Sequence, residues 1–141
     1  MRHHGVIVFI TNPDKSQFYI QQKDEKYPVK KYRLKYSLFG GEVEEGEDKE
    51  SALERELNEE LDERAKKIVL ENATYMTQLT VMGKHPYDLS IFESILPNSI
   101  LKRISKYPVK EGKRGYLANE SEMRKLPFIH RLENAIHLYL I

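Results

Sequence analysis

The stretch that most constrains this chain is residues 40–63, GGEVEEGEDKESALERELNEELDE, which hold twelve of its 22 acidic side chains. Residues 42–64 set twelve acids against three bases, a net charge of −9, whereas the remainder has ten acids and twenty bases, a net charge of +10. A nucleic-acid-binding surface does not keep such an acidic segment on its binding face, so no polymeric nucleic acid is expected as a partner. The segregation favours a site that holds cations together with a phosphate-rich ligand.

The length and composition set broad limits on the protein. With 141 residues and no Pro/Gly/Ser linker, residues 1–141 are predicted to form one domain. No apolar run approaches the length of a transmembrane helix, so no membrane partner is expected. The absence of cysteine excludes disulfides, thiolate nucleophiles and Cys-type zinc sites, and it fits a cytoplasmic location.

Hydrophobic periodicity predicts both strands and helices. Apolar, β-rich runs predict strands at about residues 5–10, 17–22, 68–82 and 87–96. Residues 31–38 alternate between apolar and basic or polar side chains, which predicts a half-buried strand with a basic outer face.

Helices are predicted over three further segments. The first begins at Asp48 as N-cap and runs to about Leu61, the second covers about residues 129–140, and a shorter turn is predicted near residues 120–125. Strands mixed with two or three helices predict an α/β or α+β sandwich, with a mixed β-sheet between helices.

The acidic helix predicted after Asp48 groups its glutamates on one side. At about 100° per residue, Glu56, Glu59 and Glu60 share an arc of roughly 100°. This arc lies beside an apolar stripe formed by Leu53, Leu57 and Leu61. Glu56 with Glu60, and Glu59 with Glu63, are like-charge pairs that each cost a few tenths of a kcal/mol on a bare surface. A bound divalent cation removes that cost, which a merely solvated acidic face leaves unexplained.

The predicted ligands of this cation are all oxygens. Oxygen ligands suit Mg²⁺, Mn²⁺ or Ca²⁺, and the segment lacks the residue order of an EF-hand calcium loop. None of the five histidines lies near these acids in the sequence, which argues against zinc.

The spacing within this segment resembles a known motif. Gly41, five residues, Glu47, seven residues and then Arg55-Glu56-Leu57-Asn58-Glu59-Glu60 resemble the Nudix box, G-x5-E-x7-R-E-U-x-E-E-x-G-U, where U is aliphatic. The resemblance covers most of the chain, with the box at residues 41–63. Two positions depart, since Asp62 replaces the glycine and Glu63 replaces the aliphatic residue. The glycine normally closes the helix in a left-handed conformation, which Asp adopts at a cost on the order of 1 kcal/mol.

This resemblance implies a Nudix-type α/β/α sandwich and a hydrolase. Nudix enzymes use Mg²⁺ or Mn²⁺ to hydrolyse a nucleoside diphosphate linked to another moiety, X. Glu56, Glu59, Glu60 and the carbonyl of Gly40 are the implied metal ligands. Glu47 and Arg55 are the implied supports that orient the helix glutamates.

A second, shorter likeness concerns residues 110–120, KEGKRGYLANE, which resemble the Lys-Glu-Gly stretch of MutT-type members. Its Glu111 is implied as an additional metal ligand or as the base that activates water. The alternatives for the base are Glu56, Glu93 and Glu120, and a surface loop glutamate is the alternative interpretation of Glu111.

Predictions for the substrate side are less constrained. Lys23 lies where MutT-type members place a substrate-facing arginine, and Arg33 is a further candidate for the phosphates, with an exposed charge as the alternative. Tyr36, Phe39 and Phe128 are candidates for stacking on a base. His130 is a candidate for reading the base, with a surface histidine at the start of a helix as the alternative. The default is a MutT-like hydrolase of a small nucleotide substrate. The preferred X group and a homodimer are left open.

Two other functions remain as alternatives. The first is a catalytically inactive Nudix-fold module that binds nucleotides or regulates another process. The second is an interaction protein with a charged surface and no metal site. Retention of every box glutamate favours the hydrolase over both.

Overall fold

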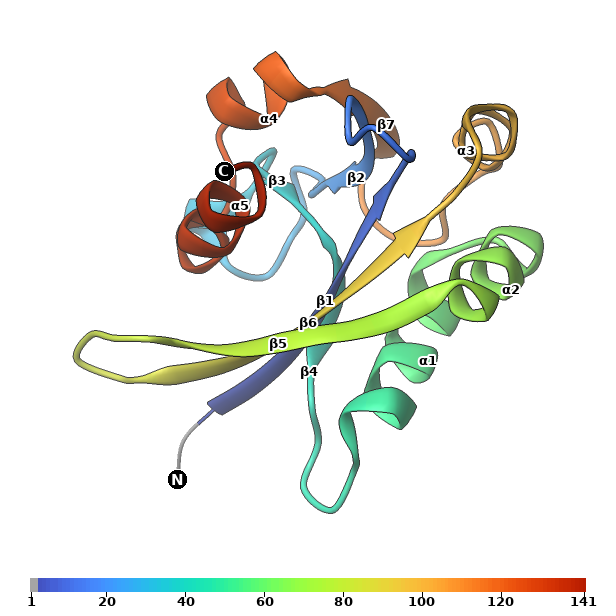
Figure 1. The fold of residues 1–141 in the computed structure, drawn as a ribbon. Helices are drawn as coiled ribbons and strands as arrows, with labels where there is room; N and C mark the ends of the chain where they lie inside the picture. The colour runs from blue at the N-terminus through green and yellow to red at the C-terminus, as the bar shows by residue number, and fades with distance from the viewer. Residues whose placement is uncertain (1–2) are drawn as a thin grey trace.

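One mixed β-sheet with helices on both faces forms the framework of the molecule (Figure 1). The computed structural model describes residues 3–141. Within them, seven strands form the sheet: β1 (His3–Thr11), β2 (Gln17–Gln22), β3 (Tyr36–Ser37), β4 (Phe39–Glu42), β5 (Ala73–Val81), β6 (Tyr87–Ile95) and β7 (Arg114–Asn119). The α-helices are α1 (Lys49–Glu60), α2 (Glu63–Glu71), α3 (Asn98–Ile104), α4 (Glu120–Lys125) and α5 (Glu133–Tyr139), and two 3-10 turns are η1 (Lys30–Tyr32) and η2 (His130–Leu132).

Strand β1 is the centre of the sheet. It pairs in antiparallel fashion with β2 and β4 and in parallel fashion with β6. The order is β3-β2-β1-β6-β5, while β7 pairs with β2. The parallel pair makes the sheet mixed, so the predicted α/β/α sandwich is confirmed.

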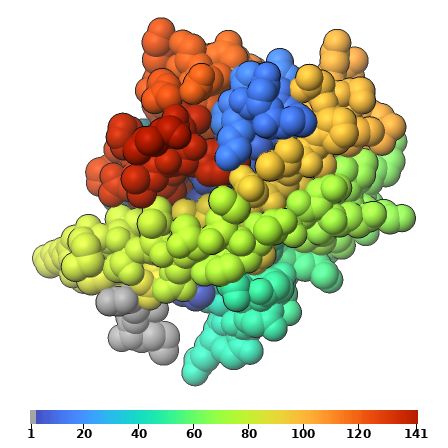
Figure 2. Space-filling model, viewed as in Figure 1, coloured from blue at the N-terminus to red at the C-terminus, as the bar shows by residue number. Residues whose placement is uncertain are grey.

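The alternation of side chains along β1 builds a core on each face of the sheet. Val6, Val8 and Ile10 join the apolar residues of α1, α2 and α3 on one face. Ile7 and Phe9 join those of α4 and α5 on the other. A strand buried on both faces reads as a continuous apolar run, which is why residues 5–10 gave a clear strand prediction. Figure 2 shows β5 as a band across the visible face, between the C-terminal segments and α1.

Helix α1 confirms its prediction at both ends. The side chain of Asp48 accepts a hydrogen bond from the Ser51 N–H at 2.7 Å, and the helix closes with Leu61 as its C-cap. Leu53 and Leu57 are buried, so the apolar stripe is the face that anchors the helix to the sheet. The acidic side is thereby fixed in direction.

The predicted strand over residues 68–82 is wrong at its start, because residues 63–71 form α2. Asp62 caps this helix by accepting a hydrogen bond from the Arg64 N–H at 2.9 Å. Ala65 and Val69, four residues apart, are buried. The apolar residues at 68–70 therefore belong to a helical stripe, and the strand begins only at Ala73.

The predicted strand over residues 31–38 is also wrong over most of its length. Lys30–Tyr32 form η1, and Leu34 takes a left-handed conformation with φ of 64°. A strand cannot pass through that conformation, and Leu34 is exposed rather than buried. Only Tyr36–Ser37 pair with β2.

The C-terminal prediction holds in outline. The helix expected over residues 129–140 is η2 followed by α5, and the shorter turn expected near residues 120–125 is α4. Helix α3 and strands β4 and β7 were not predicted. None of the helices that the structure describes is long and apolar enough to cross a membrane.

Candidate active site

Glu60, in the last turn of α1, is a buried carboxylate. Its side chain is 2% exposed. One oxygen accepts a hydrogen bond from the Gly40 N–H at 2.9 Å and the other from Gln21 Nε2 at 2.6 Å. Burial raises the pKa of Glu60 to about 8, against the lowering effects of the Gln21 amide, the Lys23 charge and the Gly40 N–H. The hydrogen-bond donors to this carboxylate are both neutral groups.

Glu56 lies one turn earlier on α1 and packs against Gly41. Its side chain is 15% exposed. A Cβ atom on Gly41 would lie 2.4 Å from the Glu56 carboxyl carbon, so this contact requires a glycine. Burial raises the pKa of Glu56, the Arg55 guanidinium opposes that rise, and the charges of Glu59 and Glu111 add to it. The glycine pair of β4 thus meets both Glu56 and Glu60.

Arg55 and Glu47, the two supports that the resemblance implies, contact each other. Arg55 Nε and Nη2 each lie 2.9 Å from a Glu47 carboxylate oxygen, a bidentate pair that lowers the pKa of Glu47 to about 2. Nη2 also donates to the Glu42 carbonyl at 2.8 Å, and Nη1 donates to Glu56 at 2.9 Å. Arg55 therefore ties the loop before α1 to the acidic side of the helix.

Glu111 is brought to the end of α1 by a loop that is fixed through its backbone. The Lys110 N–H donates to the Glu60 carbonyl at 2.8 Å, and the Lys113 N–H donates to the Gln22 carbonyl at 2.8 Å. The charge of Glu111 acts on both Glu56 and Tyr27. The structure thus places Glu111 near the helix glutamates from which the sequence separates it by about fifty residues.

The two fallback candidates for the base lie elsewhere. Glu93 accepts a hydrogen bond from the Tyr139 hydroxyl at 2.5 Å, on the face of the sheet that α5 covers. Glu120 pairs with Arg124 at 3.1 Å on α4. Neither is engaged with the α1 carboxylates, which leaves Glu56 and Glu111.

The glutamates of α1 do not converge into a finished metal centre. Among residues 3–141, no three His, Cys, Asp or Glu side chains are grouped closely enough to hold an ion. The Glu59 side chain is 47% exposed, and its carboxylate pairs with Arg55 at 3.6 Å. The negative charges of Glu56 and Glu59 repel each other, and the positive charge of Arg55 offsets that repulsion.

The donor set nevertheless fits a hard divalent cation. The carboxylates of Glu56, Glu59 and Glu60 project from one side of one helix, and oxygen donors are what Mg²⁺ prefers. A buried carboxylate bonded only to neutral donors is unfavourable when ionised, and a nearby cation offsets that cost. Gln21 Oε1, on the residue that holds Glu60, is a buried acceptor with no hydrogen-bond partner among the described residues.

A small cavity of about 60 Å³ is lined by the glycine pair, Gly40 and Gly41. Its lining also includes apolar residues of β1 and β6. The polar lining groups include Lys23, Tyr27, Tyr87 and Arg131. Lys23 was predicted for the substrate side, whereas the other three were not, because no sequence motif marks them.

The other predicted substrate contacts are not at this cavity. Arg33 is exposed and donates to the Tyr27 carbonyl at 2.8 Å, and the His130 side chain is 86% exposed beside Glu133. Phe39 is fully buried against Tyr19, and Tyr36 is buried beside Tyr116 and Phe128. Neither ring is open to a ligand in this structure, and stacking of Phe39 or Tyr36 on a base stays a prediction.

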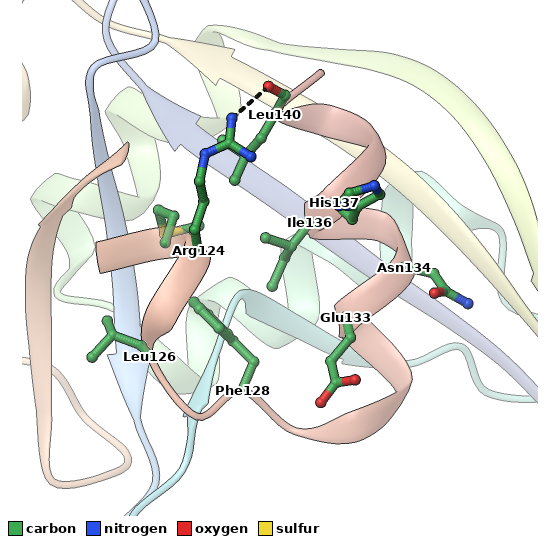
Figure 3. Close-up of a pocket in the computed structure, with 9 residues that line it drawn as sticks. Arg124, Leu126, Phe128, Glu133, Asn134, Ile136, His137 and Leu140 are labelled. Atoms are coloured by element: carbon green, nitrogen blue, oxygen red, sulfur yellow. Dashed lines mark hydrogen bonds between the residues drawn. The ribbon is translucent and has the colours of Figure 1, made fainter. Parts of the chain in front are cut away.

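A larger cavity, of about 390 Å³, lies between α4 and α5 (Figure 3). Phe128 and Ile136 contribute its apolar lining, and Arg124 reaches across to donate to the Leu140 carbonyl at 3.0 Å. None of the α1 glutamates lines it. Volume alone does not make it the candidate site.

The departure at the end of the box has a structural cause. Asp62 has φ of −54°, so it is not in the left-handed conformation that the family's glycine normally adopts, and the predicted cost of about 1 kcal/mol does not arise. Instead, α2 starts at once, with Asp62 as its N-cap and Glu63 as its first residue. Glu56 and Glu60 lie within α1, which ends before Asp62.

Comparison with known proteins agrees with this geometry. The family model described as NUDIX domain matches residues 1–103. The chain belongs to the NUDIX domain family. Membership classes the protein as a Nudix pyrophosphohydrolase. Comparison with curated protein sequences gave no match.

Several solved structures share the Nudix fold over nearly the whole chain. One is MutT, from work on Aliivibrio salmonicida and Vibrio cholerae (TM-score 0.63, 19% identity, 99% of this chain and 98% of that one). Another is the E. coli dihydroneopterin triphosphate pyrophosphohydrolase (TM-score 0.67, 18% identity, 97% and 94%). A third is a C. elegans Ap4A hydrolase (TM-score 0.60, 18% identity, 98% and 93%). At these identities the likeness shows the fold alone.

Proposed function

We propose that the protein is a Mg²⁺- or Mn²⁺-dependent hydrolase. Its substrate is a nucleoside diphosphate linked to another moiety, either a nucleoside triphosphate or an NDP-X compound, and water attacks phosphorus. The observation that carries the proposal is Glu60: a buried carboxylate on neutral donors, beside a second carboxylate and a glycine pair. A solvated acidic helix has no reason to bury this group.

The residues assigned to the ion are Glu56, Glu59, Glu60 and the Gly40 carbonyl. When bound, the ion neutralises diphosphate oxygens and lowers the pKa of water. Arg55 pairs with Glu56 and Glu59 and, through Glu47, keeps the start of α1 in place. Such supporting contacts orient metal ligands.

The proton of the attacking water goes to a carboxylate. Glu56 and Glu111 are the two candidates, because the charge of Glu111 acts on Glu56 and the two carboxylates are therefore neighbours. We assign the role to Glu111, which is exposed and does not accept from Arg55, whereas Glu56 does. A Glu111→Gln variant is then expected to lose about 10²–10⁴-fold in kcat.

The substrate class takes support from two sides. Similar structures include proteins named for dihydroneopterin triphosphate and Ap4A, which are both polyphosphate compounds. In this chain, Lys23 and Arg131 add positive charge to the cavity beside the carboxylates. Both observations favour a compound with several phosphates.

The test is turnover of a substrate panel with Mg²⁺ or Mn²⁺, measured as release of phosphate or pyrophosphate. The panel contains nucleoside triphosphates, nucleotide sugars, ADP-ribose and dinucleoside polyphosphates. We expect wild-type turnover and a loss on the order of 10³-fold in Glu60→Gln. Glu54→Gln is the matched control, because Glu54 is an exposed glutamate on the same helix.

Each contrary outcome has a distinct meaning. Unchanged activity in Glu60→Gln refutes the assigned site. A wild type that binds nucleotides but hydrolyses none of the panel supports the non-hydrolytic module instead.

A further inference from the structure

Arg131, in η2, stands at the edge of the small cavity beside Gly40 and Gly41. Its guanidinium lies over the Tyr87 ring, 4.9 Å from the ring centroid. The positive charge of Arg131 and the negative charge of Glu56 both act on Tyr87. The guanidinium therefore belongs to the same cavity as the glycine pair and Tyr87.

The carboxylate partner of Arg131 is held loosely. Nη1 lies 3.5 Å from Glu42 Oε1, and the Glu42 side chain is 48% exposed. An exposed ion pair at this distance is weak. Glu42 also accepts a hydrogen bond from the Tyr87 hydroxyl at 3.3 Å, so it keeps a partner if Arg131 leaves it. The stack on Tyr87 holds the guanidinium in place, while its N–H groups can exchange Glu42 for another acceptor.

Resting on the function proposed above, we propose that Arg131 binds a phosphate of the substrate by exchanging Glu42 for it. Arginine binds phosphate through paired N–H donors. Such charge-assisted hydrogen bonds are stronger than the exposed ion pair of 3.5 Å that Arg131 makes with Glu42. Lys23, which lines the same cavity, adds a second cation. Glu42 thus competes with the substrate for Arg131 in the free protein.

The size of the cavity favours a phosphate over a base as the group received. At about 60 Å³ it is several times smaller than the sites of drug-sized ligands, which usually measure about 300–1,000 Å³. Its Lys23 and Arg131 suit an anion, so the group next to the scissile diphosphate is a further phosphate.

The test compares Arg131→Ala, Glu42→Gln and the double variant by steady-state kinetics with Mg²⁺, on the panel substrate that the wild type turns over best. Arg131→Ala is expected to raise KM about tenfold, which equals about 1.4 kcal/mol, with kcat within about twofold. Glu42→Gln is expected to lower KM about threefold, because the competitor is weakened. In the Arg131→Ala background, Glu42→Gln should change KM no further.

A distant pair on α4 provides the matched control. Arg124 and Glu120 are an exposed arginine and glutamate 3.1 Å apart, and neither lines the small cavity. Arg124→Ala and Glu120→Gln should leave KM unchanged. An unchanged KM in Arg131→Ala, or an effect of Glu42→Gln that persists without Arg131, overturns the proposal.

A binding measurement separates this proposal from the proposed function. Inorganic pyrophosphate is titrated into wild type and Arg131→Ala by calorimetry with Mg²⁺ present. A Kd about tenfold weaker in the variant supports the role of Arg131 even if the wild type hydrolyses no substrate. Equal affinity, or no binding to the wild type, overturns it.

Discussion

The environment of Glu60 gives one residue a measurable effect on the stability of the whole protein. Its pKa is raised from the ordinary 4.5 to about 8 in the folded state. Between these values the folded protein binds more protons than the unfolded chain does, so the free energy of unfolding decreases as pH rises. Glu47 acts in a different range, because its pKa of about 2 adds stability above pH 4.5 that is lost as pH falls through about 2.

We therefore predict that the ion-free protein loses stability between about pH 5 and about pH 8. Urea denaturation in the presence of a chelator measures this, with the unfolding free energy compared across that range. Glu60→Gln should remove most of the slope. Its new amide can accept from the Gly40 N–H and, after a flip of Gln21, donate to Gln21 Oε1, which has no partner in the described structure. A slope that persists in Glu60→Gln contradicts the assignment of this pKa to Glu60.

At the scale of elements, the contact between β4 and α1 decides where the carboxylates of α1 lie. The two glycines of β4 contribute to this contact in different ways. A Cβ on Gly40 would lie 2.0 Å from the Val6 carbonyl oxygen of β1, and Gly40 has φ of 139°. The three atoms nearest to a Cβ on Gly41 would all belong to the Glu56 carboxyl group, at 2.4 to 2.6 Å. One glycine thus serves strand pairing, and the other serves the position of a proposed ligand.

This difference predicts opposite outcomes for two similar substitutions. Gly40→Ala should destabilise the fold by about 3 kcal/mol or more, because rigid backbone must move. Gly41→Ala should leave thermal stability nearly unchanged but lower kcat about 10²-fold, since Glu56 is displaced. Thermal unfolding and turnover of the two variants check both parts. Equal loss of stability in the two would contradict the assignment.

The α1–α2 junction yields a second prediction at this scale. Restoring the family glycine, as Asp62→Gly, should lower Tm by a few degrees, because α2 loses its N-cap and φ of −54° gives glycine no advantage. Thermal unfolding of the variant measures this, with Asp62→Asn as the control that keeps the cap. A rise in Tm would mean that the glycine conformation is preferred here after all.

These elements also show which parts of the fold can be predicted from sequence. Helix α1 was predicted with its cap, stripe and acidic side because local periodicity and the cap at Asp48 agree. Residues 31–38 alternate just as clearly, yet Leu34 turns to a left-handed conformation because the loop after β2 has to return to the sheet edge. Periodicity does not record such a tertiary requirement.

For the whole molecule, the limit of sequence reasoning lies in long-range placement. The box marks Glu56, Glu59 and Glu60 because their spacing is local. Gln21, Tyr87 and Arg131 reach the site from β2, β6 and η2, and nothing local distinguishes them from other polar residues. The Lys-Glu-Gly likeness did indicate Glu111, and the backbone bonds of residues 110 and 113 explain how it reaches α1.

Because the proposed ion site joins distant segments, ion binding should stabilise the entire fold. Gln21, Gly40 and Glu60 are separated along the chain but meet through two hydrogen bonds, so unfolding destroys the site completely. An ion bound only by the folded state adds about 2.7 kcal/mol at a hundred times its Kd. We predict that Mg²⁺ and Mn²⁺ raise Tm, whereas Na⁺ at equal ionic strength does not.

Glu54→Gln should keep this increase in Tm, and Glu60→Gln should lose most of it. An equal increase in Glu60→Gln would show that the ions act on the acidic surface in general, because screening of the net −9 segment does not depend on one buried carboxylate.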